Sequence, residues 1–494
     1  MSKDQTATID IENEYSQLSL FLKENDVGVL EETNLDIYRT IELIFEKNNP
    51  TTAFYIINLG SIIRQLQYWR ELFPYIEPRY AVKCNPNRVI CQLLGLLGVG
   101  FDVASRGEID LVKEYVGGDM TKIIYANPYK EPSSIQYARQ MDVDIATFDS
   151  ASELLKIKLY HPGCKLLMRL KVDDSGSVCK FSEKFGVDMD EVPSLLNHAR
   201  TLELNLVGVC FHVGSSCTSP KQYYGAIEMA RKVFNMAADM GFTMNMIDIG
   251  GGFSGQQTPK SRELMSGIRD NVYAALCDHF YADFHIPGFE PPSTAASKRG
   301  DDVSDDDLPR LELIAEPGRF FVEASHILLV NLIGKKVKYV KPGAKVGCDS
   351  SVAPHAATTI TTSKSIGTII NAGVEEDDNP APHKRARLCS IAGEQREKIF
   401  YYYLNDGVYG SFNCIYFDHA KVEVLPYNER DGARYRSIIF GPTCDSMDKI
   451  QTDIELPELE IGEWCFVRNF GAYTTAAASD FNGFTKKKAF YILN

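Results

Sequence analysis

Eight short runs of apolar residues between Tyr80 and Ala315 are the feature that most limits what this chain can fold into. The runs are Tyr80–Lys83, Gly100–Ala104, Lys122–Ala126, Asp144–Phe148, Lys165–Leu170, Leu206–Val213, Met244–Ile249 and Leu311–Ala315. Each has the length of a buried strand, and a segment long enough for a helix separates it from the next. The first four recur about every 20 residues, which is the length of one strand, one short helix and two loops. Eight such units in series predict a parallel (β/α)8 barrel.

Nearly every run ends in a polar residue or in glycine. These end residues are Lys83, Asp102, Asn127, Asp149, Arg169, His212, Gly250–Gly252 and Glu316. In a parallel barrel the carboxyl ends of all strands open onto one face, and active sites lie there. Strands that merely end in polar loops would explain one or two of these cases easily and all eight poorly. The strand ends therefore predict an active site on that face.

The sequence after the barrel changes character. Its apolar runs alternate or lack helical spacing, as in Phe400–Tyr403, Val422–Leu425, Ser437–Phe440 and Trp464–Arg468. This pattern predicts a second domain, a mostly antiparallel β-sandwich or β-barrel. We expect a disordered tail at 1–14, an N-terminal segment at 15–52 that joins the β domain, the barrel at 53–325 and the β domain at 326–494. Two polar stretches, the acidic 291–307 and the long 346–398, are expected to be inserted surface loops.

Charge and composition narrow the classes of partner. The net charge of -14 argues against nucleic acid and anionic membrane, because both attract basic surfaces. No stretch approaches the roughly 20 apolar residues of a membrane span, and the polar N-terminus has no signal-peptide core. The 12 cysteines form no Cys-x-x-Cys pair. Reduced thiols in the cytosol fit this better than a disulfide framework or a zinc site.

Lys83 is the first candidate for chemistry. Apolar walls at the mouth of a barrel would remove water from a lysine there and lower its pKa. A neutral amine can form a Schiff base with a carbonyl. A lysine whose amine simply reaches solvent explains the residue equally well.

Two glycine-containing strand ends predict a phosphate site. Gly250–Gly252 follows one strand directly, and Gly318 and Arg319 follow another. Successive N–H groups of such turns bind anions, and late barrel strands commonly build phosphate sites. Glu316 beside a phosphate would be repelled unless it served another atom, and the pyridine nitrogen of pyridoxal 5'-phosphate (PLP) is such an atom. A structural salt bridge remains the alternative for Glu316. His212 could stack on the ring, although a lone histidine is more often a structural hydrogen-bonding residue.

The same residues lie in motifs that resemble those of the eukaryotic ornithine decarboxylases. The motifs are Tyr80–Asn85, Phe101–Ser105, Phe211–Ser215, Asp248–Phe253, Glu316–Arg319, Asn405–Asn413, Phe417–His419, Gly441–Asp445 and Gly471–Tyr473. The resemblance covers about Phe54 to Phe484. It implies a PLP-dependent enzyme that converts L-ornithine to putrescine and CO2, the first step of polyamine biosynthesis. It also implies a cytoplasmic homodimer with shared active sites.

The resemblance implies a role for each matching residue. Lys83 would hold PLP covalently, Glu316 would bind the pyridine nitrogen and His212 would stack on the ring. The residues expected to line the rest of the cofactor pocket are Asp102, Arg169, Ser215, Gly250, Gly251, Gly252, Gly318, Arg319 and Tyr473. Those expected at the substrate are Asp418 and Asp445 for the distal ammonium, Phe417 and Phe481 beside it, and Cys444 as proton donor to the substrate carbon.

Two departures from the family and three alternatives stay open. The stretch 346–398 is longer than expected, and Phe417 stands where the family has tyrosine beside the substrate aspartate. A decarboxylase of lysine or another basic amino acid would share most of these residues. A diaminopimelate enzyme is disfavoured because Asp418 and Asp445 would oppose a distal carboxylate. A non-catalytic relative like the antizyme inhibitors is expected to lose cofactor residues that this chain retains, and antizyme itself is left open as a partner.

Overall fold

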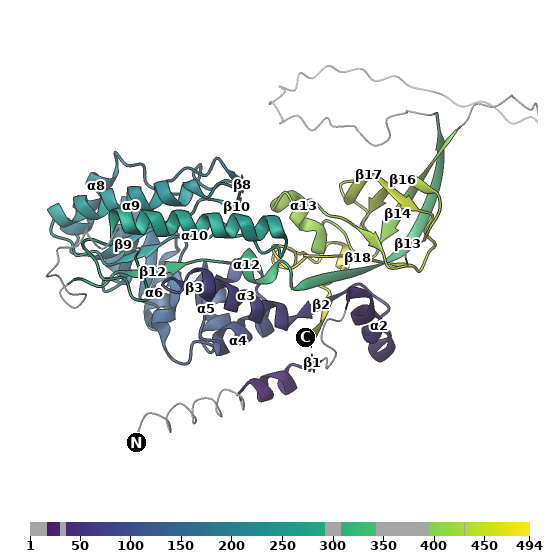
Figure 1. Ribbon diagram of the computed structural model, residues 1–494, viewed down its shortest axis with the longest axis horizontal. Helices are drawn as coiled ribbons and strands as arrows, with labels where there is room; N and C mark the ends of the chain where they lie inside the picture. Colours follow the sequence, from purple (N-terminus) through teal and green to yellow (C-terminus); the bar gives the residue numbers. More distant parts are fainter. Residues whose placement is uncertain (1–16, 30–35, 292–307, 342–395, 429) are drawn as a thin grey trace, which may run out of the picture.

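The computed structural model describes residues 17–29, 36–291, 308–341, 396–428 and 430–494. The predicted tail at 1–14 lies outside these residues, as do almost all of 291–307 and most of 346–398. Figure 1 shows a barrel with its helices on one side and a sheet domain on the other, with the long strand β13 running between them. No helix among the described residues is long and apolar enough to cross a membrane.

Eight parallel strands close into a barrel in the order β11-β12-β3-β4-β5-β6-β7-β9. Their bounds are β3 Glu77–Ala81, β4 Gly100–Val103, β5 Ile123–Tyr125, β6 Ile145–Phe148, β7 Lys165–Leu170, β9 Asn205–Phe211, β11 Met246–Asp248 and β12 Glu312–Ala315. Each overlaps one of the eight predicted runs, so the predicted barrel is confirmed. The strands are almost entirely buried because helices cover the outside and side chains fill the inside.

Helices surround the barrel. They are α3 Leu59–Leu72, α4 Arg88–Leu96, α5 Arg106–Val112, α6 Pro132–Gln140, α7 Ala151–Tyr160, α8 Val192–Thr201, α9 Lys221–Asp239, α10 Pro259–His279 and the short α12 Arg319–Val322. Local sequence explains where several begin. Asn87 caps α4 by accepting hydrogen bonds from the N–H groups of Val89 and Ile90, and proline occupies the first turn of α6, α8 and α10. Two short strands, β8 Ser177–Cys179 and β10 Ser215–Cys217, pair antiparallel beside the barrel mouth.

The second domain is a nine-stranded sheet with mostly antiparallel pairs, in the order β1-β19-β2-β13-β14-β16-β17, with β18 on β13 and β15 on β18. The bounds are β1 Gly28–Val29, β2 Phe54–Asn58, β13 His326–Val340, β14 Glu397–Leu404, β15 Leu425–Pro426, β16 Arg434–Phe440, β17 Lys449–Pro457, β18 Trp464–Val467 and β19 Lys488–Leu493. The helices α2 Ile37–Asn48 and α13 Cys414–Phe417 accompany it. The predicted sheet domain is therefore present.

The structure differs from the sequence prediction in three respects. The predicted strand Val422–Leu425 is reduced to Leu425, because the residues before it form no ladder. β13, β17 and β19 had not been predicted. The expected barrel range 53–325 opens with β2, but β2 pairs with β13 and β19 in the sheet, and the barrel strands run from Glu77 to Ala315.

The N-terminal segment packs on the sheet. Ile41 and Ile44 of α2 form one hydrophobic cluster with Phe54, Phe466 and Ile492, which come from three strands far apart in the chain. Burial of this apolar stripe holds α2 against the sheet. The association of the whole range 15–52 with the β domain stays a prediction.

Candidate active site

Lys83 lies two residues beyond the end of its strand. β3 ends at Ala81, and Lys83 occupies a single 3-10 turn, Val82–Cys84, at the barrel mouth. Its amine forms an ion pair with Asp102 at the end of β4, and the Lys83 side chain is 38% exposed. The expected fall in the pKa of Lys83 is wrong for this structure. Burial does lower that pKa, but the carboxylates of Asp102 and Glu316 raise it more, and the pKa lies above its ordinary value.

Glu316 follows β12 and is buried beside two other carboxyl groups. Burial raises its pKa well above the ordinary range, and the nearby Asp102 and Asp248 raise it further. Its backbone N–H donates to the carbonyl of Gly250 at 2.7 Å, which joins the Glu316 loop to the glycine turn. The predicted strand-end residues of β3, β4, β11 and β12 therefore lie close together at the carboxyl ends of the strands.

The glycine turn after β11 needs its glycines. Gly250 and Gly252 have φ of 64° and 110°, where a side chain is strained. A Cβ on Gly251 would lie 2.8 Å from Nε2 of His212 and 2.9 Å from the carbonyl oxygen of Glu316. The turn thus places backbone without side chains against His212 and Glu316, as an anion-binding turn requires.

His212 lies beside this turn, and the charge of Arg169, near the end of β7, acts on it. Nδ1 of His212 accepts a hydrogen bond from the N–H of Gly214 at 3.0 Å, and the edge of the ring meets Phe181. Burial lowers the pKa of His212 well below its usual value, and the cations of Arg169 and Lys83 add to this. The imidazole is therefore neutral at physiological pH, and a neutral ring is suited to stacking on an aromatic cofactor.

Arg319 lies close to two other predicted phosphate-binding residues, Tyr473 and Ser215. Its guanidinium lies 5.2 Å from the ring centre of Tyr473 and 3.4 Å from the hydroxyl of Ser215. Gly318 packs closely against the turn that carries Lys83, since a Cβ on Gly318 would lie 2.9 Å from Cβ of Cys84. The backbone N–H of Tyr473 donates to the Cys84 carbonyl at 2.9 Å, which ties this loop of the sheet domain to the turn that carries Lys83.

Asp418 belongs to the same group in this structure. Its two carboxylate oxygens accept hydrogen bonds from Nη2 of Arg319 at 2.7 and 2.6 Å. The sequence had paired Asp418 with a substrate ammonium and Arg319 with a phosphate. Both roles require Arg319 to turn from Asp418 toward a phosphate, and they stay predictions.

Cys444, Asp445 and Phe481 form a separate group. The Tyr409 hydroxyl donates to Asp445, and the Tyr409 ring stacks on Phe481 with centroids 4.3 Å apart. Cys444 is exposed, and its N–H donates to the side chain of Asn482. Among the described residues, no hydrogen bond, ion pair or ring contact joins this group to Lys83 or Asp418.

Asp448 holds the loop of this second group in place. It is 1% exposed and accepts hydrogen bonds from the N–H groups of Val408 and Thr443 at 2.8 and 2.9 Å. These bonds fasten the Cys444–Asp445 loop to the segment that carries Tyr409. Sequence reasoning assigned no role to Tyr409 or Asp448, although Tyr409 lies inside a motif that the resemblance had matched.

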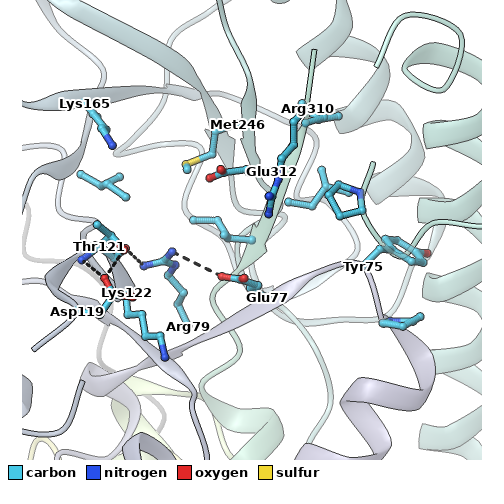
Figure 2. Close-up of a pocket in the computed structure, with 16 residues that line it drawn as sticks. Tyr75, Glu77, Arg79, Asp119, Thr121, Lys122, Lys165, Met246, Arg310 and Glu312 are labelled. Atoms are coloured by element: carbon cyan, nitrogen blue, oxygen red, sulfur yellow. Dashed lines mark hydrogen bonds and ion pairs between the residues drawn. The ribbon is translucent and has the colours of Figure 1, made fainter. Parts of the chain in front are cut away.

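Two large cavities flank the barrel. One, of about 520 Å³, lies between barrel and sheet and is lined by Arg319, Asp418 and Ser216, so it adjoins the candidate site. The other, of about 470 Å³, lies at the amino ends of the strands, where Glu77 and Arg79 begin β3 (Figure 2). None of the predicted site residues lines that second cavity. The chemistry is thus expected at the carboxyl ends of the strands.

The pocket residues fit PLP. An amine, a glycine turn beside a guanidinium, and a buried carboxyl match the aldehyde, the phosphate and the ring nitrogen of that cofactor. Among the described residues, Nε of Arg319 and Oδ1 of Asp102 are buried without a hydrogen-bond partner, so these polar atoms remain for a ligand. Fold and site together define a barrel enzyme that uses PLP.

Comparison with known proteins defines the family. Residues 59–323 match the pyridoxal binding domain of the pyridoxal-dependent decarboxylases, and residues 264–471 match their C-terminal sheet domain. The chain belongs to the pyridoxal-dependent decarboxylase family, and its cofactor is PLP. This confirms the family resemblance, the fold class and the cofactor that the sequence predicted.

Several relatives are similar over most of their length. Ornithine decarboxylase of Mus musculus is 37% identical over 90% of this chain and 81% of its own. Antizyme inhibitor 2 of Xenopus laevis is 35% identical over 96% of this chain and 88% of its own. Among solved structures, the arginine decarboxylase of Paramecium bursaria Chlorella virus has a TM-score of 0.71 and 29% identity, covering 92% of this chain and 100% of its own. A lysine/ornithine decarboxylase of Vibrio vulnificus, complexed with putrescine, has a TM-score of 0.66 and 25% identity, covering 92% and 98%.

Proposed function

We propose that the protein decarboxylates L-ornithine to putrescine and CO2, the first step of polyamine biosynthesis. The observation that supports the proposal is the joint presence of residues that fit PLP and of two carboxylates, Asp418 and Asp445, in motifs matching those of ornithine decarboxylases. Relatives named ornithine decarboxylase at 36–37% identity support the same substrate.

Bound PLP supplies the electron sink for the bond that breaks at the substrate's α-carbon. Lys83 holds the cofactor, and Asp102 positions the Lys83 amine. Glu316 would keep the ring nitrogen protonated, and the neutral His212 would stack on the ring. Arg319, Ser215, Tyr473 and the glycine turn bind the phosphate.

The substrate end draws on both groups of residues, on Asp418 beside Arg319 and on the separate group of Cys444, Asp445 and Phe481. Asp418 and Asp445 bind the distal ammonium by charge-assisted hydrogen bonds. Phe481 and Phe417 flank the alkyl chain, and the thiol of Cys444 returns a proton to the substrate carbon. One methylene separates ornithine from lysine, which is worth only about 1–3 kcal/mol of discrimination. The length of the pocket beyond Asp445 therefore decides between the two.

The second group completes the site of a partner chain in a two-fold homodimer. Phe481 of this group is 40% exposed, and Met447, two residues after Asp445, is 56% exposed. Phe417, which precedes Asp418, is 71% exposed. Such apolar side chains around a polar loop are typical of an interface. A two-fold axis places each loop at the other chain's barrel mouth, so that both sites are equivalent.

Product identification tests the substrate. Purified protein with PLP is incubated separately with ornithine, lysine and arginine, and the amines and CO2 are quantified. Putrescine formed from ornithine at the highest kcat/KM supports the proposal. Cadaverine from lysine or agmatine from arginine as the preferred product would overturn it.

A non-catalytic role is the second candidate. The similarity to antizyme inhibitor 2 of Xenopus laevis favours it. The intact set of Lys83, Asp102, His212, Glu316 and Cys444 opposes it, since a protein without catalysis has no need of them. CO2 release above that of a Lys83→Ala variant excludes this candidate, and its absence with all three amino acids supports it.

Antizyme as a partner and a cytosolic location are further parts of the proposal. All 10 cysteines in the described residues carry free thiols, which suits a reducing compartment. Co-purification with antizyme and cell fractionation test these two points separately from the activity.

A further inference from the structure

Three carboxyl groups are buried together at the floor of the PLP pocket. Asp102, Asp248 and Glu316 are 1%, 0% and 7% exposed. Of the three, Asp102 forms an ion pair, with Lys83. Unpaired buried carboxylates side by side are costly, so the other two need a different source of stabilisation.

Asp248 ends β11 directly before the glycine turn. Its Oδ1 accepts a hydrogen bond from the N–H of Gly250 at 2.8 Å, which holds the start of the turn. Its Oδ2 is fully buried and receives no hydrogen bond from any donor group in the described protein. The carboxyl of Glu316 lies within hydrogen-bonding reach of the Asp248 carboxyl.

Two ionised carboxylates cannot hydrogen-bond to each other, but one proton between them makes a strong bond. That proton gives Oδ2 of Asp248 its missing donor. It also leaves the pair with one negative charge, which is the charge that a protonated ring nitrogen would balance.

The surrounding charges are consistent with a shared proton. Burial raises the pKa of Asp248 to about 6, partly opposed by the Gly250 N–H and by Glu316, while Asp102 raises it and Arg79 lowers it. Burial raises the pKa of Glu316 well above its ordinary value; Asp102 and Asp248 add to this, and Lys83 and Arg169 oppose it. Since both shifts favour proton binding, we expect the pair to hold one proton near neutral pH, shared between the two carboxyl groups.

We propose that Asp248 is a positioning residue that shares one proton with Glu316 and so fixes the Glu316 carboxyl in the orientation that faces the ring nitrogen of PLP. The inference rests on the role proposed above for Glu316. The simpler alternative is that Asp248 serves the glycine turn alone, through its bond to Gly250.

Infrared spectroscopy detects the shared proton and does not depend on enzyme turnover. In full-length protein freed of PLP, the C=O band of a protonated carboxylic acid should be present near neutral pH. It should weaken in Asp248→Asn, because the asparagine amide donates to an ionised Glu316 and no proton is needed. Glu316→Gln should weaken the same band.

Asp174→Asn is the matched control for this spectrum. Asp174 is also buried, but it receives hydrogen bonds from the N–H groups of Phe181 and Ser182 at 2.6 and 2.9 Å. Those donors and the Ser182 hydroxyl lower the pKa of Asp174 against the effect of burial. The carboxylic acid band should therefore be unchanged in the control.

The affinity for PLP distinguishes two possible roles of Asp248, which are to position Glu316 and to support the glycine turn. Asp248→Ala should weaken PLP binding roughly tenfold to a hundredfold, whereas Asp248→Asn, which keeps both hydrogen bonds, should weaken it only about threefold. In a Glu316→Gln background the Asp248→Ala change should cost about threefold or less, because its effect is transmitted through Glu316.

Two results would overturn the proposal. One is a carboxylic acid band that Asp248→Asn leaves at full strength. The other is an equal loss of PLP affinity on Asp248→Ala in both backgrounds, which would assign Asp248 to the glycine turn alone. Neither result depends on the amino acid substrate, so both are distinct from a failure of the proposed ornithine activity. Should Asp248→Ala fail to fold, the near-isosteric Asp248→Asn still decides through its spectrum.

Discussion

The barrel mouth and the Cys444–Asp445 loop are built in opposite ways. At the barrel mouth, Asp102, His212 and Glu316 are packed inside one chain, and burial together with neighbouring charges shifts the pKa of His212 and of Glu316 strongly. On the loop, Cys444 is exposed, and local hydrogen bonds lower the pKa of Asp445 without help from burial. The difference teaches that burial within one chain fixes the proposed cofactor end, whereas the proposed substrate end lies on an exposed loop, which the proposed homodimer would cover.

The largest effect is expected from removing Lys83, the residue proposed to hold the cofactor. Lys83→Ala should abolish the visible absorbance of bound PLP and lower kcat by roughly three orders of magnitude or more. Lys171→Ala is the matched control, since Lys171 also forms an ion pair, with Asp188, and is 39% exposed. Normal absorbance and rate in Lys83→Ala would refute the assignment.

Mixing two inactive variants tests whether the two regions come from different chains. After subunit exchange between Lys83→Ala and Cys444→Ala, half of the dimers are hybrids with one intact site in two. Activity should then return to roughly one quarter of wild type. If each site lay within one chain, every site would keep one lesion, and activity would stay near zero although a label demonstrates exchange.

Asp445→Ala should discriminate between substrates. Loss of one partner for a desolvated ammonium costs about 2–3 kcal/mol, so kcat/KM for ornithine should fall roughly 30- to 150-fold. An uncharged analogue such as norvaline should lose much less. Asp453→Ala, at an exposed aspartate of the same domain, is the control. Equal losses for ornithine and norvaline would mean that Asp445 only supports its loop.

The smallest expected effect concerns Phe417. A hydroxyl restored by Phe417→Tyr adds one polar contact near the substrate ammonium, worth about 0.5–1.5 kcal/mol. KM for ornithine should fall a few-fold while the absorbance of bound PLP stays the same. A changed absorbance with unchanged KM would place Phe417 at the cofactor end instead.

The comparison of the two regions also shows where sequence reasoning succeeded. The eight barrel strands follow from apolar runs and their spacing, because burial on both faces of a parallel strand leaves a continuous apolar signature. The glycine turn was predictable as well, since a positive φ at Gly250 and Gly252 demands glycine. β13 was missed because its outer part, from Ile333 onward, is half-exposed and rich in lysine.

Electrostatics could not be predicted so well. The sequence suggested that burial would lower the pKa of Lys83, but the sign depends on two carboxylates that arrive from β4 and from the loop after β12. The ion pair of Arg319 with Asp418 joins residues 99 positions apart, and no local pattern marks it. The pairing of Asp248 with Glu316 had one weak signal, a carboxylate at a strand end directly before a glycine run.

The sequence by itself determined the barrel strands, the order of the motifs and the groups that we propose to meet the cofactor. Those properties depend on short segments, whose periodicity and backbone demands are visible in the chain. Only the tertiary structure decided that β2 joins the sheet, that Lys83 faces Asp102 and that Asp445 stands apart from Asp418. These depend on distances between residues remote in the chain, and the energy of a charge is set by its neighbours in space.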